Sequence, residues 1–221
     1  MQNVTGNNRI YLSGGGNEKQ SFPLDKFFFN ALPQNGCFLY VPMALKDNKL
    51  YPIVHLWMKK VLQLHNQNDI QFETADNLPQ YQFEDLKKFD AIYIGGGNTW
   101  NLIQELRNSD FSQKLIKYLQ NGGVIYGGSA GAIVLGKNID THDDENKINF
   151  KDISGFNLLR DYSVACHYTN EQSERFKDWA ISHNSPILCL SEESGFILEN
   201  GFALCLGNKP CIMYLANGIK K

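Results

Sequence analysis

A serine flanked by small residues follows an apolar run near the middle of the chain, in Tyr126-Gly127-Gly128-Ser129-Ala130-Gly131. This pattern is typical of a nucleophile elbow, in which a strand turns sharply into a helix and only small neighbours let the turn close. Ser129 would then stand exposed as a nucleophile, and the N–H of Ala130 would stabilise a developing oxyanion. The same kind of turn can also cradle a phosphate, so the motif alone leaves both chemistries open.

A serine nucleophile needs a general base, and five histidines compete for that role. His167 directly follows the apolar run Ser163–Cys166, so it is predicted to lie at the carboxyl end of a strand, as Ser129 does. We therefore expect His167 to be the general base. The other four histidines lie in predicted helices or loops, and these positions explain them without a catalytic role. They are His55, His65, His142 and His183.

Two further glycine-rich segments follow predicted strands, at Ser13–Asn17 and Gly95–Thr99. Such loops can bind phosphate, but the sequence has neither a Walker A motif nor an intact Gly-x-Gly-x-x-Gly after its first strand. We interpret Gly96 or Gly97 as the second oxyanion donor, facing Ser129 across a crevice. The alternative is that these glycines only close a tight turn.

Short apolar runs, which are typical of strands, alternate along the chain with helical patterns, and these strands and helices must position the residues named above. This alternation predicts a doubly wound, mostly parallel α/β sheet, in which the loops at the carboxyl ends of the strands carry the site. The last third predicts short antiparallel strands. The predicted strands are 10–12, 37–41, 70–72, 91–94, 124–126, 163–166, 187–190, 196–198, 202–206 and 211–215. The predicted helices are 24–32, 51–65, 99–107, 112–120 and 172–182, with another after Ser129.

Composition bounds the class of protein. The 221 residues are 43% hydrophobic and include no linker-like stretch, so one domain over residues 1–221 is expected. A net charge of −2 offers no broad cationic surface, which argues against binding to nucleic acid or anionic lipid. Residues 1–6 show no basic segment followed by an apolar one, so no signal peptide or membrane span is predicted and a cytoplasmic location is expected. The oligomeric state is left between monomer and homodimer.

The five cysteines are odd in number, widely spaced and mostly within apolar runs. We predict that they are free thiols in a reducing cytosol, rather than disulfides or a metal site. They are Cys37, Cys166, Cys189, Cys205 and Cys211.

Three segments in order resemble the peptidase E family, serine dipeptidases that cleave after an N-terminal aspartate and are similar in fold to class I glutamine amidotransferases. They are Gly-Gly-Gly-Asn-Thr-Trp-Asn-Leu at 95–102, Gly-Ser-Ala-Gly-Ala at 128–132 and Cys-His-Tyr-Thr-Asn at 166–170, within a resemblance that runs from about residue 90 to about 215. The resemblance implies a small peptide substrate and no metal or cofactor. By position it implies Ser129 as nucleophile and His167 as base. It further implies oxyanion donors at Ala130 and Gly96 or Gly97, and substrate contacts at Asn98, Thr99 and Arg175.

The third triad member must orient the imidazole and stabilise its charged form. The family places an aspartate fifteen residues beyond the serine, and this spacing falls on Asp144. Asp143 or Asp140 would replace it if the loop differs by a residue or so. Glu192 also follows a predicted strand at the same edge and aligns with a family glutamate. It would bind the substrate's free amino group, or act as the partner of His167 as in atypical members.

The sequence departs from the family where specificity is set. Typical members have a longer insertion with basic residues after the histidine, whereas here Arg175 is the only arginine left, with Lys177 as a point charge beside it. We therefore predict a serine exopeptidase for short peptides, with Asp-X dipeptides among its substrates but without a strict preference for aspartate. Two alternatives stay open: a non-peptidase serine hydrolase or amidase, and a non-catalytic small-molecule-binding protein on an amidotransferase-like fold.

Overall fold

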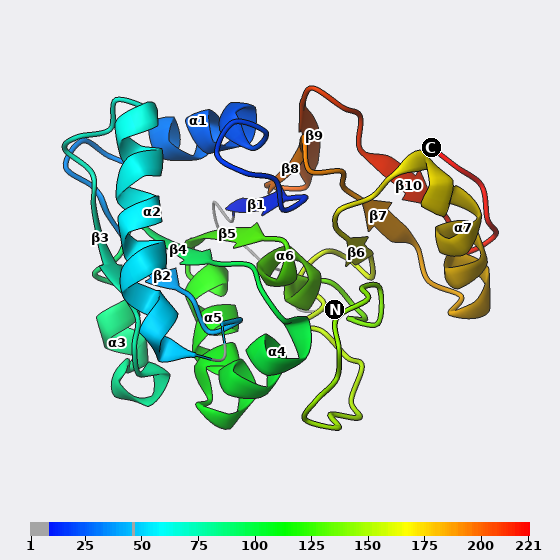
Figure 1. Cartoon of the computed structure of the whole chain (residues 1–221), viewed down its shortest axis with the longest axis horizontal. Coiled ribbons are helices and arrows are strands. Elements are labelled where there is room, and N and C mark those ends of the chain that lie inside the picture. The colour runs from blue at the N-terminus through cyan, green and yellow to red at the C-terminus, as the bar shows by residue number, and fades with distance from the viewer. Residues whose placement is uncertain (1–8, 46) are drawn as a thin grey trace.

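The computed structural model describes residues 9–45 and 47–221, so the stretch 1–6, where no leader is predicted, lies outside the described residues. Its centre is a seven-stranded sheet with the order β3-β2-β4-β5-β1-β8-β9 (Figure 1). Five of its strands are parallel, whereas β8 runs antiparallel to β1 and β9 antiparallel to β8. The bounds are β1 (Arg9–Ser13), β2 (Cys37–Val41), β3 (Gln71–Thr74), β4 (Ala91–Ile94), β5 (Val124–Gly128), β8 (Ser194–Glu199) and β9 (Phe202–Gly207).

Helices cover both faces of this sheet, which confirms the predicted doubly wound α/β class. One face packs against α1 (Phe22–Ala31) and α2 (Tyr51–Leu64). The other packs against α3 (Phe83–Leu86), α4 (Thr99–Asn108), α5 (Phe111–Gln120) and α6 (Ala130–Leu135). Since both faces are covered, the central strands are apolar throughout, as in β4, where every residue is buried. No helix in the described part of the chain has the length and apolarity to cross a membrane.

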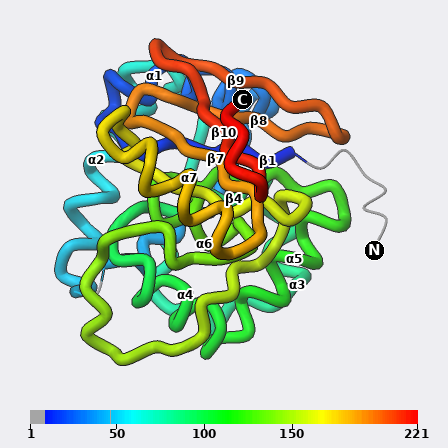
Figure 2. Tube along the Cα trace, turned by 90° about the vertical axis from the view of Figure 1, so that its right-hand side faces the viewer, coloured from blue at the N-terminus to red at the C-terminus, as the bar shows by residue number. Residues whose placement is uncertain are grey.

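The C-terminal third departs from the prediction in one respect. Three of its strands, β6 (Ser163–Ala165), β7 (Ile187–Cys189) and β10 (Ile212–Tyr214), form a separate sheet to the right of the main sheet in Figure 1. β6 and β7 are parallel, and α7 (Ser173–Ser182) is the crossover between them. Figure 2 looks at this side and shows the long connection from α6 to β6, residues 136–162, running around the lower part of the molecule.

The prediction of five free thiols is wrong for two of them. Cys205 in β9 and Cys211 before β10 form a disulfide, with their Cα atoms 6.0 Å apart. The chain reverses direction after β9, which brings Cys211 back beside Cys205, and this reversal cannot be read from the spacing of the cysteines. The remaining free thiols are Cys37, Cys166 and Cys189.

A carboxyl group, that of Asp25 in α1, is buried between this helix and the sheet. Asp25 accepts hydrogen bonds from the hydroxyl of Ser21 at 2.6 Å and from that of Tyr126 at 2.5 Å. Burial outweighs these bonds and raises the pKa of Asp25 from 3.8 to about 6. The protein therefore holds an ionised carboxylate in its interior at neutral pH.

We expect Asp25 to make the free energy of unfolding fall as pH rises. Its pKa is higher folded than unfolded, so its stabilising contribution is complete below pH 3.8 and is lost as pH rises through about 6. At about 1.4 kcal/mol per pKa unit the full loss is about 3 kcal/mol, of which about 1.4 kcal/mol falls between pH 5 and pH 7.5. Urea unfolding of the wild type and Asp25→Asn at these two pH values checks this. An equal pH dependence in both proteins would contradict it.

Candidate active site

β5 ends in the turn that carries Ser129. This residue has φ 50° and ψ −114°, a conformation that residues other than glycine rarely adopt, and α6 begins at the next position. A Cβ at Gly131 would lie 2.2 Å from the carbonyl oxygen of Ile94, and one at Gly127 would lie 2.6 Å from the carbonyl oxygen of Gly131. Glycine at these positions lets α6 pack against the strands, so the strand–turn–helix geometry of a nucleophile elbow is present.

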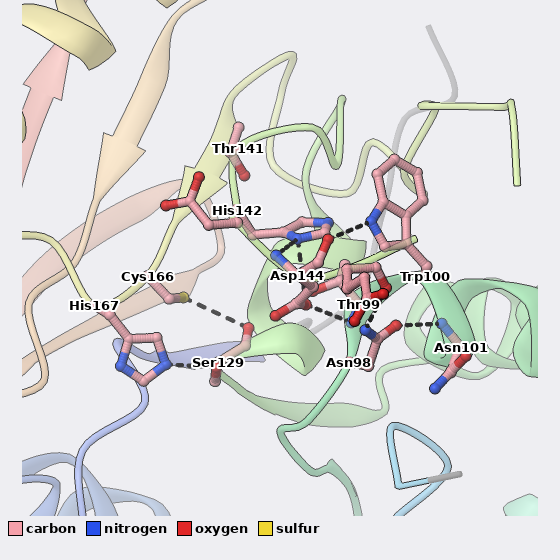
Figure 3. Close-up of polar contacts among 12 residues, drawn as sticks. Asn98, Thr99, Trp100, Asn101, Ser129, Thr141, His142, Asp144, Cys166 and His167 are labelled. Carbon is pink, nitrogen blue, oxygen red and sulfur yellow. Dashed lines mark hydrogen bonds and ion pairs between the residues drawn. The ribbon is translucent and has the colours of Figure 1, made fainter. Parts of the chain in front are cut away.

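His167 reaches Ser129 from the end of β6 (Figure 3). Its Nε2 lies 2.9 Å from Oγ of Ser129. The backbone N–H of His167 donates to the carbonyl of Gly14, and that of Ser129 donates to the carbonyl of Ser13. The end of β1 and the first residue of the loop after it therefore hold the backbones of both residues.

The other ring nitrogen of His167 faces Glu192, in the segment that leads into β8. The distance from Nδ1 to Oε1 of Glu192 is 3.1 Å, and Nε2 of Gln20 donates to Oε2 at 2.9 Å. The hydrogen bond from His167, followed by that from Gln20, lowers the pKa of Glu192 below its usual 4.5. Glu192 is therefore a carboxylate at neutral pH, and it completes a continuous chain from Ser129 through His167.

Three glycines let the loop after β1 approach the hydrogen-bonded residues His167 and Glu192 closely. A Cβ at Gly14 would lie 1.9 Å from the carbonyl oxygen of Ser191, and one at Gly16 would lie 2.2 Å from that of Glu192. At Gly15 it would lie 2.5 Å from the imidazole of His167. The sequence showed this glycine-rich loop but did not predict that it packs against His167 and Glu192. No sequence signal pointed to Gln20.

Asp144, which the family spacing predicts as the third member, lies elsewhere. Its carboxylate accepts a hydrogen bond from the N–H of Thr99 at 2.7 Å and lies 3.2 Å from Nδ1 of His142 (Figure 3). Its backbone carbonyl accepts a hydrogen bond from the indole of Trp100. An anion is favourable at the N-terminus of α4, which explains why the loop folds there. The structure does not bring Asp144 to His167.

Asp140 and Asp143, the alternatives to Asp144 as third triad member, also have partners other than His167. Asp140 lies 2.9 Å from Nε2 of His183. Asp143 forms a bidentate pair with Arg175, with distances of 2.6 and 2.7 Å. Of the acidic residues singled out from the sequence, Glu192 is the one beside His167.

Backbone from two segments lies beside Ser129. Ala130 is the first residue of α6, so its N–H has no acceptor within the helix. A Cβ at Gly96 would lie 3.1 Å from that of Ser129, so the backbone of Gly96 runs against the nucleophile. Gly97 packs instead against the carbonyl of Ala44. Between the two glycines predicted as oxyanion donors, Gly96 has the better position.

A cleft of about 530 Å³ opens beside Ser129, and we call it the main cleft. Arg175 lies in it with both arms of its guanidinium on Asp143, and these hydrogen bonds lower the pKa of Asp143. Burial lowers the pKa of His142, and its Nδ1 accepts the N–H of Asp144, so this ring is neutral. Two carboxylates and one guanidinium thus make up the charge of the wall, which includes Thr99, His142, Asp143, Asp144 and Arg175.

Asn98 and Thr99, both predicted to contact substrate, are placed differently. The side chain of Asn98 accepts from the N–H of Asn101 and donates to the carbonyl of Glu145, each at 3.0 Å, so it caps α4 and holds the loop. Thr99 lines the main cleft, and its Oγ1 is buried without a partner among the residues that the structure describes. Nowhere in 9–45 and 47–221 do three or more His, Cys, Asp or Glu side chains gather as metal ligands would.

Comparison with known proteins gives a consistent result. Residues 10–209 match the profile described as peptidase family S51. The chain is 30% identical over 131 residues to an uncharacterized peptidase of Pasteurella multocida, a match that covers 56% of this chain and 62% of that protein. It is 27% identical over 168 residues to peptidase E of Nostoc, covering 71% and 67%. The crystal structure of a candidate peptidase E protein from Listeria monocytogenes superposes with a TM-score of 0.71 at 20% identity, covering 92% of this chain and all of that one.

Proposed function

This chain belongs to peptidase family S51, and we propose that it is a serine exopeptidase that cleaves short peptides through Ser129, His167 and Glu192. One observation carries the proposal. His167 lies within hydrogen-bond distance of Ser129 through one ring nitrogen, at 2.9 Å, and of Glu192 through the other, at 3.1 Å. This is the arrangement by which a histidine activates a serine.

The proposed reaction is acyl transfer. Nε2 of His167 takes the proton of Ser129 as its Oγ attacks the peptide carbonyl, and Nδ1–H remains bonded to Glu192. The N–H groups of Ala130 and Gly96 stabilise the negative charge on the tetrahedral oxygen. His167 then gives its proton to the leaving amine, and water hydrolyses the ester on Ser129 by the same steps.

An exopeptidase that acts at the N-terminus must recognise an ammonium group beside the scissile bond. The carboxylates of Asp143 and Asp144 both line the main cleft, whereas Glu192, which bonds His167 and Gln20, is not among its lining residues. We assign the N-terminal residue to the main cleft, where these aspartates favour a positive charge.

The same cleft gives little support for a strict preference for aspartate. An acidic side chain would be recognised best by the guanidinium of Arg175, but Asp143 occupies both arms of that fork. An aspartyl substrate must displace Asp143 and then lie near two carboxylates. We propose that neutral N-terminal residues are cleaved as well as aspartate.

Freeing Arg175 should shift this specificity. In Asp143→Ala, the ratio of kcat/KM for aspartyl over alanyl peptides is expected to rise about tenfold, the equivalent of about 1.4 kcal/mol from a charge-assisted bidentate contact. Glu145→Ala, which removes a neighbouring carboxylate that pairs with Lys147 outside the cleft, is the matched control and should leave the ratio unchanged. A ratio that falls in Asp143→Ala would show that Asp143 helps to bind aspartyl substrates.

Hydrolysis of a panel of dipeptides and aminoacyl chromogenic substrates tests the proposed function. The panel varies the N-terminal residue among Asp, Glu, Ala, Leu and Lys, and wild type is compared with Ser129→Ala. Cleavage that disappears in the variant supports the peptidase. Turnover of chromogenic esters alone would favour a non-peptidase hydrolase, and no turnover that depends on Ser129 would favour a binding protein.

A further inference from the structure

A second, smaller cavity of about 140 Å³ opens on the other side of Ser129. It shares Ser129, Gly15 and Gly96 with the main cleft, so the two cavities meet at the nucleophile. We call it the aromatic lobe. Its side-chain walls come from β1, β2, β4, α2 and the residue before α1, and they are Ser13, Tyr40, Tyr93, Trp57 and Ser21.

The chemistry of the aromatic lobe differs from that of the main cleft. No ionised side chain is among its lining residues, because Asp25 lies behind Ser21 with its carboxylate bonded to that hydroxyl. Only hydroxyls, aromatic rings and glycine backbone face the space. A charged group placed here would lose hydration without gaining a partner, which disfavours it strongly.

Polar groups of three aromatic side chains border this lobe, namely the hydroxyls of Tyr40 and Tyr93 and the indole N–H of Trp57. Tyr40 is 4% exposed, and it is one of the residues that line the lobe. A Cβ at Gly95, another lining residue, would lie 2.9 Å from that oxygen, so the hydroxyl reaches the wall of the lobe. Burial raises the pKa of Tyr40, and the group is therefore a neutral donor. A neutral hydroxyl at the wall of a cavity can donate a hydrogen bond to a ligand bound there.

A peptide held with its scissile carbonyl at Ser129 has one residue on each side of the bond. The aspartates that suit an N-terminal ammonium group lie in the main cleft, so the residue on the other side of the bond has the aromatic lobe available to it. We propose that the aromatic lobe is the subsite for the leaving residue and selects a small, uncharged one, with Tyr40 as its hydrogen-bond donor. This inference rests on the exopeptidase function proposed above.

The small volume of the aromatic lobe supports the selection of a small leaving residue. Pockets that take drug-sized ligands span roughly 300–1,000 Å³, a range that includes the main cleft and lies above the 140 Å³ of the aromatic lobe. Trp57 of α2 is the largest side chain on its wall. The lobe therefore fits glycine, alanine or serine, whereas leucine would require Trp57 to move.

Widening the lobe tests the assignment. The substrates are alanyl-glycinamide, alanyl-alaninamide and alanyl-leucinamide, which keep the leaving residue uncharged at its carboxyl end. Trp57→Ala should raise kcat/KM for the leucinamide relative to the glycinamide at least tenfold. Leu56→Ala, a substitution at the neighbouring position of α2 where the side chain is 58% exposed and outside the lobe, should leave the ratio unchanged.

Narrowing the lobe should have the opposite effect. A Cβ at Gly128 would meet no atom closer than 3.7 Å, so Gly128→Ala adds one methyl group to the wall without a clash. We expect the leucinamide-to-glycinamide ratio to fall about tenfold. Tyr40→Phe should lower kcat/KM for all three amides by a factor of roughly 2 to 10, the cost of one neutral hydrogen bond.

The outcomes separate this inference from the proposed function. Cleavage that depends on Ser129, with the same leaving-residue ratio in wild type, Trp57→Ala and Gly128→Ala, would overturn the subsite and leave the peptidase intact. A changed preference for the N-terminal residue instead would assign the lobe to the acyl side and also overturn it. No cleavage dependent on Ser129 would overturn both.

Discussion

Ser129→Ala is expected to lower kcat/KM for every cleaved peptide by about 10⁴-fold or more, with the fold unchanged. The variant removes the oxygen that forms the ester and keeps the N–H groups of Ala130 and Gly96, which leave a residual rate above that in water. Loss of His167 should cost about as much, because the serine hydroxyl is a poor nucleophile without its base.

The double variant gives the sharper test. Ser129→Ala combined with His167→Ala should be no slower than either single variant, since the two residues act as one unit. Ser109→Ala, which removes a hydroxyl bonded to the carbonyl of Glu105 at the C-terminal end of α4, is the control and should keep full activity. Single-turnover and steady-state rates on one peptide measure these effects, and multiplicative losses would mean that the two residues act separately.

Glu192→Gln is expected to lower kcat about 10³- to 10⁴-fold. A neutral amide no longer stabilises the imidazolium, and its NH₂ group favours the tautomer of His167 that carries the proton on Nε2, where it cannot accept the serine proton. Asp144→Asn should change kcat by less than tenfold, because that carboxylate bonds the N–H of Thr99 and not His167.

The pair of variants decides which acid is the third member. Both are measured with kcat across pH 5 to 9, together with thermal melting, so that a loss of folding is not mistaken for a loss of catalysis. Some loss of stability is expected in Asp144→Asn, since it weakens the anion at the N-terminus of α4. A larger loss of kcat in Asp144→Asn than in Glu192→Gln would return the role to Asp144.

The sequence was most informative where local pattern decides structure. The apolar runs predicted every strand of the main sheet. For the central strands the reason is that a strand covered on both faces must be apolar along its length, as Ala91–Ile94 is. The division into two sheets was not predicted, since Ile187–Cys189 and Phe202–Gly207 have similar composition and only tertiary packing assigns them to different sheets.

In the site, too, the residues marked by their local sequence were predicted, whereas a contact between distant segments was not. Ser129 and Gly96 lie in strand-end loops whose composition marks them, and His167 follows a strand directly. The partner of His167 could not be chosen, because Asp144 and Glu192 belong to segments whose paths are set by contacts with α4 and with the loop after β1. Cys205 and Cys211 were likewise read as separate thiols, since their meeting depends on a reversal between two sheets.

The glycine run after β1 also bears on how such a protein can diversify. The backbone at Gly14, Gly15 and Gly16 packs directly against Ser191, His167 and Glu192. A side chain at any of these three positions would clash with the catalytic residues or with the backbone that holds them. The floor of the site is thus built from main chain, which offers mutation little to vary. Its walls are side chains from several segments, among them the loop 136–162, α7 and α2, and these can change one at a time. New substrate ranges can therefore arise on an unaltered catalytic centre, through the walls alone.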